Sequence, residues 1–331
     1  MRRVASRGGT IALALGLLLG LAATGCSRGG ETPKHDGFRV ALLTPGPVSD
    51  GGWNASAYEG LQRIGKELGA ETSNVQTTSP AEFEQTFRDY ARKGFDLVIG
   101  HGFEYQDAAM KVGAQYPDTA FLVSSGGVSA KNVASLEFQL DEATYLAGLV
   151  AASISKTGKA GCVGGIQLPV IKTTFDGFEA GARSVRPDFK VSTVYTGSFE
   201  DVAGAKAATD ALIAQGADVI LHNADAAGIG VFQAAKAGGA LAFGTNKDQA
   251  PVAPDTVLAS AVIDMPKAFV QVAREVKDKT FTGRVVKEGF ATGCVDFTWN
   301  PALQGRVPAD VRAKVDAAKA KIATGELKVL P

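Results

Sequence analysis

Between residues 38 and 244, this 331-residue chain alternates short apolar runs with longer segments whose apolar side chains recur at helical spacing. Runs such as VALL at 40–43 and DLVIG at 96–100 lack that spacing, as expected of parallel strands covered by helices on both faces. The alternation occurs in two successive sets, the first ending near residue 127 and the second starting at residue 141. We therefore predict an α/β fold with two lobes, each built on an open sheet.

The same pattern predicts the individual elements. Helices are expected at 55–68, 81–93, 106–116, 141–156, 175–185, 202–215 and 228–238. Strands are expected at 40–43, 96–100, 120–123, 160–164, 191–195, 217–221 and 241–244. Asp50 precedes the first helix, where its carboxylate can accept hydrogen bonds from the free N–H groups of the first turn.

Polar and aromatic residues follow the strands of both lobes. Ligands of open α/β sheets bind off the carboxyl ends of the strands, and a cleft between two domains is a common small-molecule site. Trp53 and Asn54 follow the first strand and offer a flat π surface beside an amide. The alternative is that Trp53 caps the core and Asn54 is a turn residue. The other predicted ligand contacts are Asp50, Gly102, Phe103, Ser124, Ser125, Phe175, Phe199, Asn223, Asp225, Asn246 and Asp248. Among them, Phe103, Phe175 and Phe199 are candidates for the face of a planar ligand opposite Trp53.

The N-terminal residues are typical of an exported protein. Arg2, Arg3 and Arg7 precede an apolar segment at 11–23 that is too short to anchor a protein across a bilayer. The following AATGC resembles a bacterial lipobox, in which the cysteine is acylated and becomes the first mature residue. We expect residues 1–25 to be a lipoprotein signal peptide, Cys26 to carry lipid and 26–37 to be a polar tether. The alternative is an ordinary secretory signal with an incidental cysteine.

Composition excludes several classes of protein. The formal net charge is zero and no basic block occurs, which gives no electrostatic case for nucleic-acid binding. The three histidines and the two remaining cysteines, Cys162 and Cys294, lack metal-ligand spacing, so no metal site is predicted. Those cysteines either form a disulfide or stay as separate buried thiols, and the sequence leaves both possibilities open.

Cofactor and catalytic motifs are weak. Gly228 and Gly230 open a helix after a strand, a near miss to the dinucleotide fingerprint, but Gln233 occupies its third small position. Tight helix packing explains these glycines, so no cofactor is predicted. No G-x-S-x-G elbow is present, and nothing singles out one acidic residue as a general base. We therefore predict a protein that is not an enzyme.

Six stretches carry a resemblance to a known family: SDGGWN with AYEGL, GFEYQDAAMKVGAQYPD, NVASLEFQLDEATYLAGLVAASISKTGKAGCVGG, DGFEAGA, ALIAQGADVI with GIGVFQAA, and GTNKDQ. Together they resemble the basic membrane protein family of solute-binding lipoproteins over about residues 38–325. The resemblance implies a type I periplasmic-binding-protein fold with two Rossmann-like lobes joined by three crossovers. It also implies purine nucleosides or bases as ligands, and delivery to an ABC permease.

Only some of the ligand-binding residues that the resemblance implies are present in this chain. Trp53 stands where the family usually has a Phe that stacks on the base, and Asn54 keeps the family's Asn. Ser124 and Ser125 fall where many members have an Asp that reads the ring. Asn246 replaces an Asp that reads ribose, and Ile263 falls near a common Lys; Asp248 keeps its place in the motif. These departures make a nucleobase or another small solute nearly as well supported as a nucleoside.

The resemblance also implies how the chain divides. The N-terminal lobe would contain 38–138 and 262–291, and the C-terminal lobe 139–261 and 292–331. The resulting prediction is a monomeric solute-binding lipoprotein at the periplasmic or extracellular face of a membrane, with a purine-like ligand between the lobes. The alternatives are a sensor or interaction lipoprotein and a nucleoside-processing enzyme.

Overall fold

The computed structural model describes residues 37–50 and 52–330. The predicted signal peptide, Cys26 and the tether up to residue 36 lie outside the described residues. Among the helices that are described, none is long and apolar enough to cross a membrane.

The first sheet has the strand order β11-β5-β4-β3-β1-β2, and every neighbouring pair is parallel. Side chains alternate between its faces, because Val40 and Leu42 belong to one core cluster and Ala41 and Leu43 to another. Both faces are therefore covered by helices, as the continuous apolar run predicts. The strands are β1 (Arg39–Thr44), β2 (Glu71–Gln76), β3 (Leu97–His101), β4 (Ala120–Ser124), β5 (Val133–Phe138) and β11 (Val285–Glu288), and the helices are α1 (Trp53–Leu68), α2 (Pro80–Arg92), η1 (Phe103–Tyr105), α3 (Gln106–Gly113) and α8 (Met265–Lys277).

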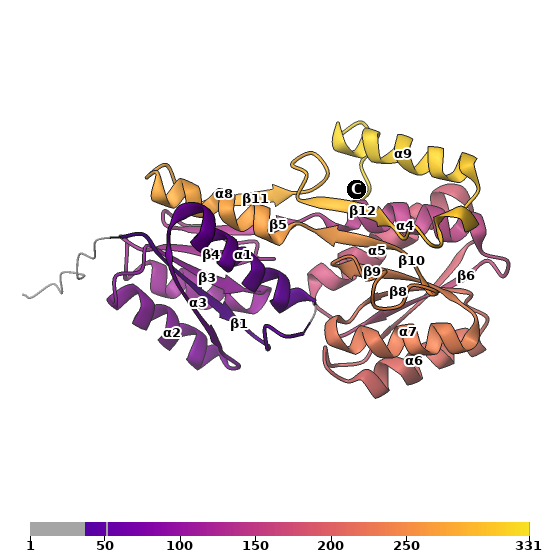
Figure 1. Cartoon of the computed structure of the whole chain (residues 1–331), viewed down its shortest axis with the longest axis horizontal. Helices are drawn as coiled ribbons and strands as arrows, with labels where there is room; N and C mark the ends of the chain where they lie inside the picture. Colours follow the sequence, from indigo (N-terminus) through magenta and orange to yellow (C-terminus); the bar gives the residue numbers. More distant parts are fainter. Residues whose placement is uncertain (1–36, 51, 331) are drawn as a thin grey trace, which may run out of the picture. The chain divides into compact units, whose positions relative to one another are not determined.

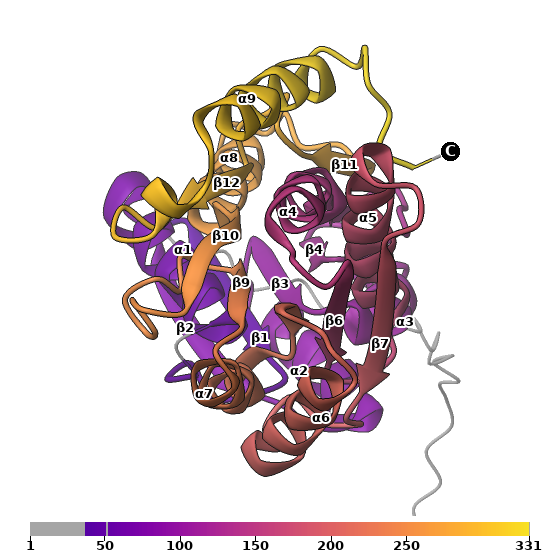
Figure 2. The same ribbon diagram turned by 90° about the vertical axis from the view of Figure 1, so that its right-hand side faces the viewer.

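The second sheet has the order β12-β10-β9-β8-β6-β7, with only β12 antiparallel to its neighbour. Its strands also serve two cores, since Cys162 and Val163 of one strand belong to different clusters. Figure 2 shows α6 beside α7, well apart from the pair α4 and α5. The strands are β6 (Lys159–Gly164), β7 (Lys190–Tyr195), β8 (Val219–Asn223), β9 (Leu241–Asn246), β10 (Val257–Ile263) and β12 (Val295–Trp299), and the helices are α4 (Leu140–Ile154), α5 (Pro169–Val185), α6 (Val202–Ala214), η2 (Asp225–Ala227), α7 (Gly228–Gly238), η3 (Gln304–Arg306) and α9 (Ala309–Ala323).

The chain passes between the two sheets three times: after β5, after β10 and after β11. Figure 1 shows the consequence, because the orange α8 and β11 lie among the indigo and purple elements of the first lobe. The predicted fold, two α/β lobes joined by three crossovers, is confirmed. Strand β10 ends at Ile263 and α8 begins at Met265, and the domain limits drawn from the sequence stay a prediction.

Most predicted elements match the structure to within two or three residues at each end, and the exceptions have physical reasons. Helix α5 begins at Pro169 rather than at Phe175, because proline is suited to the first helical turn. Strand β8 lies within that margin, because it begins and ends two residues later than predicted, at Val219 and Asn223. The apolar pattern does not predict β2, whose side chains ETSNVQ are polar and mostly exposed at the sheet edge.

Candidate ligand-binding site

Asp50 organises the start of α1. Its Oδ1 accepts hydrogen bonds from the N–H groups of Gly52 and Ala55, both at 2.9 Å. Its Oδ2 accepts from the backbone N–H and the side-chain amide of Asn54, both at 2.8 Å. The predicted capping role of Asp50 is confirmed, since its carboxylate satisfies N–H groups that a helix start leaves free.

Trp53 lies at this helix start and is backed by a histidine. Its ring stacks on that of His101 with centroids 4.2 Å apart and an interplanar angle of 24°. Phe138 meets the Trp53 ring edge-on, with ring centroids 6.5 Å apart. Trp53 is partly buried and packs against the hydrophobic core, while part of its surface remains exposed. His101 is absent from the sequence-based site residues, although its position directly before Gly102 at a strand end was a usable signal.

The hydrogen bonds of His101 define its protonation. Nε2 donates to the Trp53 carbonyl at 3.0 Å, because a carbonyl oxygen only accepts, and this leaves Nδ1 to accept from the Ser124 hydroxyl at 2.8 Å. Burial lowers the pKa of His101 to about 3, so the ring is neutral at physiological pH. Ser124 is fully buried, and its hydroxyl therefore supports His101 in this structure.

Asp225 brings a carboxylate from the second lobe to the same place. Its Oδ1 accepts the backbone N–H of Trp53 at 3.0 Å, across 172 positions of sequence. Burial, and after it the carboxylate of Asp50, raises the pKa of Asp225 to about 7. Two predicted site residues from different lobes, Asp50 and Asp225, thus meet at one helix N-terminus.

Backbone strain concentrates at the strand ends. Among the described residues, four that are not glycine have left-handed φ values, and three of these follow or end strands of the two sheets. They are Ser125 after β4, Asp225 after β8 and Asn246 at the end of β9, with φ of 55°, 50° and 69°. Such conformations cost free energy and cluster at functional sites. All three belong to the predicted site.

The second lobe adds a chain of buried amides. The Asn246 amide nitrogen donates to the Asn223 side-chain oxygen at 3.4 Å, and the Asn223 amide nitrogen donates to the Thr174 hydroxyl at 3.3 Å. These three side chains are at most 8% exposed. The structure therefore brings Asn223 and Asn246 together, in a neutral arrangement.

The three candidate phenylalanines differ in exposure. Phe175 is 4% exposed and its ring lies 5.9 Å from that of Tyr195, so its surface belongs mostly to the core. Phe103 and Phe199 keep partly exposed rings. The Phe199 ring lies against Gly165, where a β carbon would overlap it.

Gly102, directly before Phe103, is buried and has a φ of 141°, a backbone conformation that favours glycine.

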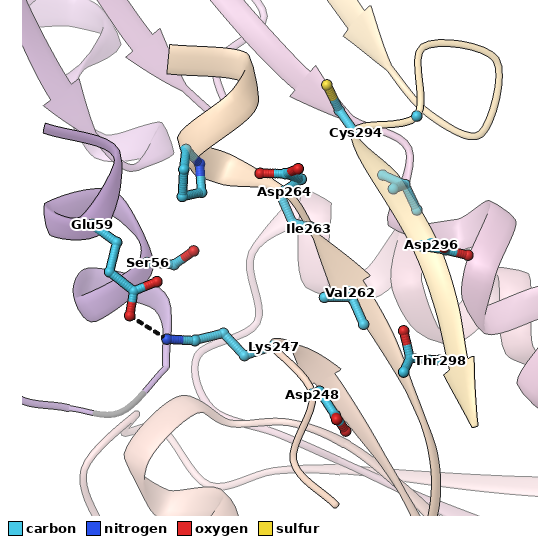
Figure 3. A pocket seen from close by; sticks show the side chains of 13 residues that line it. Ser56, Glu59, Lys247, Asp248, Val262, Ile263, Asp264, Cys294, Asp296 and Thr298 are labelled. Atoms are coloured by element: carbon cyan, nitrogen blue, oxygen red, sulfur yellow. Dashed lines mark hydrogen bonds and ion pairs between the residues drawn. The ribbon is translucent and has the colours of Figure 1, made fainter. Parts of the chain in front are cut away.

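Asp248, together with Lys247, lines a pocket of about 380 Å³ between α1, the end of β10 and β12, shown in Figure 3. The Lys247 ammonium pairs with Glu59 of α1 at 2.7 Å, drawn as the dashed line. Ile263 also lines this pocket. We call it the hinge pocket, because its walls come from both lobes next to the second crossover. Trp53, Asn54 and Asp225 are not among the residues that line this pocket.

The described part of the chain also bears on the possible metal site, the possible disulfide and the glycines that open α7. No group of three or more His, Cys, Asp or Glu side chains there is arranged to hold a metal ion. Cys162 and Cys294 are buried free thiols. Gly230 packs α7 against α6, because a β carbon there would overlap the Val202 carbonyl. This contact supports the packing interpretation for Gly230, and a β carbon on Gly228 would overlap the His222 ring.

Residues 38–329 match the family described as ABC transporter substrate-binding protein PnrA-like, or Bmp. An ABC transporter nucleoside-binding protein, BmpA of Lactococcus lactis, is 32% identical, with 86% of this chain and 88% of that protein covered. A purine-binding protein of Brucella abortus is 30% identical, with 90% and 85% covered.

Solved structures of solute-binding proteins have a similar fold. A solute-binding protein of an ABC transporter system from Conexibacter woesei has a TM-score of 0.73 at 30% identity, with 89% of this chain and 98% of that one covered. One from Aeropyrum pernix has a TM-score of 0.81 at 24% identity, covering 88% and 92%, and this likeness concerns the fold alone.

Proposed function

Because the chain belongs to the PnrA-like family of ABC transporter substrate-binding proteins, we propose that it binds a purine base or nucleoside between its lobes and delivers it to an ABC permease. Members of this family work on the outer side of the membrane, with a small-molecule ligand and a permease as partners. The proposal adds the ligand class, the monomeric state and the lipid on Cys26. It assigns the protein no enzymatic activity.

The observation that most supports the proposal is the partly exposed Trp53 ring stacked on His101, which we call the Trp53 platform. An indole ring backed by a neutral histidine, and flanked by Asp50, Asn54 and Asp225, suits a planar heterocycle with hydrogen-bonding edges. The names of two relatives, a purine-binding and a nucleoside-binding protein, point to the same ligand class. Phe103 and Phe199 are the candidates for the opposite face of the ligand, because their rings remain partly exposed.

The ribose contribution should be small. Asn246 is a neutral residue whose amide already contacts Asn223. A hydrogen bond to a charged group contributes about 1.5–3 kcal/mol, against nearer 1 kcal/mol for a neutral one. We therefore expect purine bases to bind within about 10-fold of their nucleosides, a gap of about 1.4 kcal/mol or less.

Calorimetric titration of adenine, guanine, adenosine and guanosine tests the ligand class. Binding of at least one of the four is expected, and binding of none overturns the purine proposal. A nucleoside preference of 1000-fold would contradict only the argument from Asn246.

Incubation with a mixed metabolite extract separates the alternative functions, since chemically altered ligand indicates an enzyme and a protein that retains no ligand favours an interaction role. Mass measurement of the native protein tests for lipid on Cys26.

A further inference from the structure

Hydrogen-bond acceptors from both lobes gather where α1 begins. Asp50 comes from the first lobe, and Asp225 reaches the Trp53 N–H from the second at 3.0 Å. Glu200, also from the second lobe, is among the charges that raise the pKa of Asp225. A β carbon built on Gly46 would lie 2.8 Å from the Asn54 amide nitrogen and 4.0 Å from Glu200 Oε1. Asp50 and Asp225 therefore both contact the start of α1, and Glu200 lies close enough to raise the pKa of Asp225.

Asn54 leaves an acceptor without a partner in this group. Its side chain is 5% exposed, and its amide nitrogen donates to Asp50 Oδ2 at 2.8 Å. This bond fixes the orientation of the amide, because a carboxylate oxygen only accepts. Within the described residues, Asn54 Oδ1 is buried and has no hydrogen-bond partner. An unpaired buried acceptor costs free energy, so a donor that reaches it is favoured.

The backbone of Asp225 shows that this carboxylate is held in place at a cost. Its φ of 50° lies in the left-handed region, which glycine adopts without strain. Its Oδ1 lies so close to Gly52 that a β carbon there would overlap it. Only a glycine at position 52 therefore allows the carboxylate to reach the Trp53 N–H.

The pKa of Asp225 is affected most by burial and by other acidic side chains. The largest influences on its pKa are burial, the charge of Asp50, the Trp53 N–H, a side-chain hydrogen bond with Asp50 and the charge of Glu200, and none of these is a cation. The Asp225 and Asp50 carboxylates and the Asn54 oxygen are all hydrogen-bond acceptors. A ligand that brings N–H donors to them would therefore be favoured.

We propose that Asp225 is a specificity-determining residue which, with Asp50 and the Asn54 oxygen, selects planar ligands with adjacent N–H donors on one edge. The inference rests on the proposed function, because it concerns the edge of a ring that lies on Trp53. A ring stacked there directs its in-plane edge toward groups beside the indole, and those groups are acceptors. Guanine offers such a donor pair, N1–H and the 2-amino group, whereas hypoxanthine lacks the amino group.

Calorimetry with matched ligands tests this assignment at pH 8. Guanosine is compared with inosine, and guanine with hypoxanthine, since each pair differs only in the 2-amino group. We expect the ligand with the amino group to bind about 10-fold tighter or more, because a hydrogen bond to a carboxylate is stronger than one to a neutral acceptor. Asp225→Asn keeps the shape and tolerates left-handed φ, and it should reduce the preference to less than about 3-fold.

Two further variants keep the test interpretable. Asp225→Gly relieves the backbone and should lose the preference as well, which covers a failure of Asp225→Asn to fold. Asp188→Asn removes an exposed carboxylate of the same lobe, whose side chain is 81% exposed, and should keep the wild-type preference. Equal binding within each pair, or a preference that survives both Asp225 variants, overturns the role of Asp225 while the purine proposal stands. Binding of none of the four ligands overturns this inference, and the purine proposal falls with it only when adenine and adenosine also fail to bind.

Discussion

Trp53 is the residue on which ligand affinity should depend most. Stacking of a base on an aromatic side chain contributes roughly 1–3 kcal/mol. Trp53→Ala should therefore weaken purine binding by about 10-fold or more, whereas Trp53→Phe should keep most of the affinity. The chain has only two tryptophans, so Trp299→Phe leaves Trp53 as the single indole fluorophore for titrations. Unchanged affinity in Trp53→Ala would assign Trp53 to core packing.

Asp225 makes a pH dependence of stability testable without a ligand. Burial and Asp50 raise its pKa in the folded protein to about 7, well above the ordinary value of 3.8. The folded state then binds a proton more tightly than the unfolded state. The contribution of this group to stability is complete below about pH 4, falls as the pH rises toward 7 and is lost above about pH 8.

Asp225→Asn removes this titration while the side chain keeps an acceptor for the Trp53 N–H. Relative to wild type, its melting temperature should rise more at pH 8 than at pH 5. Thermal unfolding of both proteins at the two pH values measures the difference, with Asp188→Asn as the control for loss of an exposed carboxylate. An identical shift at both pH values would contradict a raised pKa for Asp225.

At the scale of elements, α4 and α5 are in contact through their glycines. A β carbon on Gly148 of α4 would overlap the Phe178 carbonyl, and one on Gly181 of α5 would overlap the Tyr145 carbonyl. Because backbone atoms block both positions, the helices must move apart to accept a larger residue. Such overpacking costs about 1–3 kcal/mol, occasionally more.

Gly148→Ala and Gly181→Ala should therefore each lower the melting temperature by at least about 2 °C. Gly305→Ala is the matched control, because nothing lies within 4 Å of its added carbon and it should leave the melting temperature unchanged. Circular dichroism during heating gives the comparison. Alanine at 148 without loss of stability would show that the two helices are less tightly packed than described.

The elements also show how far the sequence could predict this protein. Continuous apolar runs predict β1, β3, β4, β6 and β9, because a strand buried on both faces has little room for polar side chains. β2 escapes prediction, since an edge strand needs no apolar run. Pattern also predicts Trp53 and Asp50 at the start of α1. It cannot place Asp225 on the Trp53 N–H, because that contact depends on how two lobes meet rather than on local sequence.

At the scale of the whole molecule, Lys247 and Glu59 join the two lobes beside the hinge pocket. Their charged groups lie 2.7 Å apart, with side-chain exposures of 28% and 52%. Solvent screens a pair of this exposure, so we expect it to contribute about 0.2–1 kcal/mol. Its importance is in its position, because the ligand of a two-lobed binding protein stabilises one arrangement of the lobes.

Removing this pair therefore tests which arrangement the contact favours. If it favours the ligand-binding arrangement, Lys247→Ala and Glu59→Ala should each weaken purine binding by up to about 5-fold, and the double variant should lose no more than either single one. The effect should shrink at high salt. Lys206→Ala, which breaks the Lys206–Asp210 pair within α6, should leave affinity unchanged. Tighter binding after loss of Lys247 would instead mean that the pair holds the lobes in an arrangement that binds ligand poorly, because a contact can only shift the lobes toward the state in which it forms.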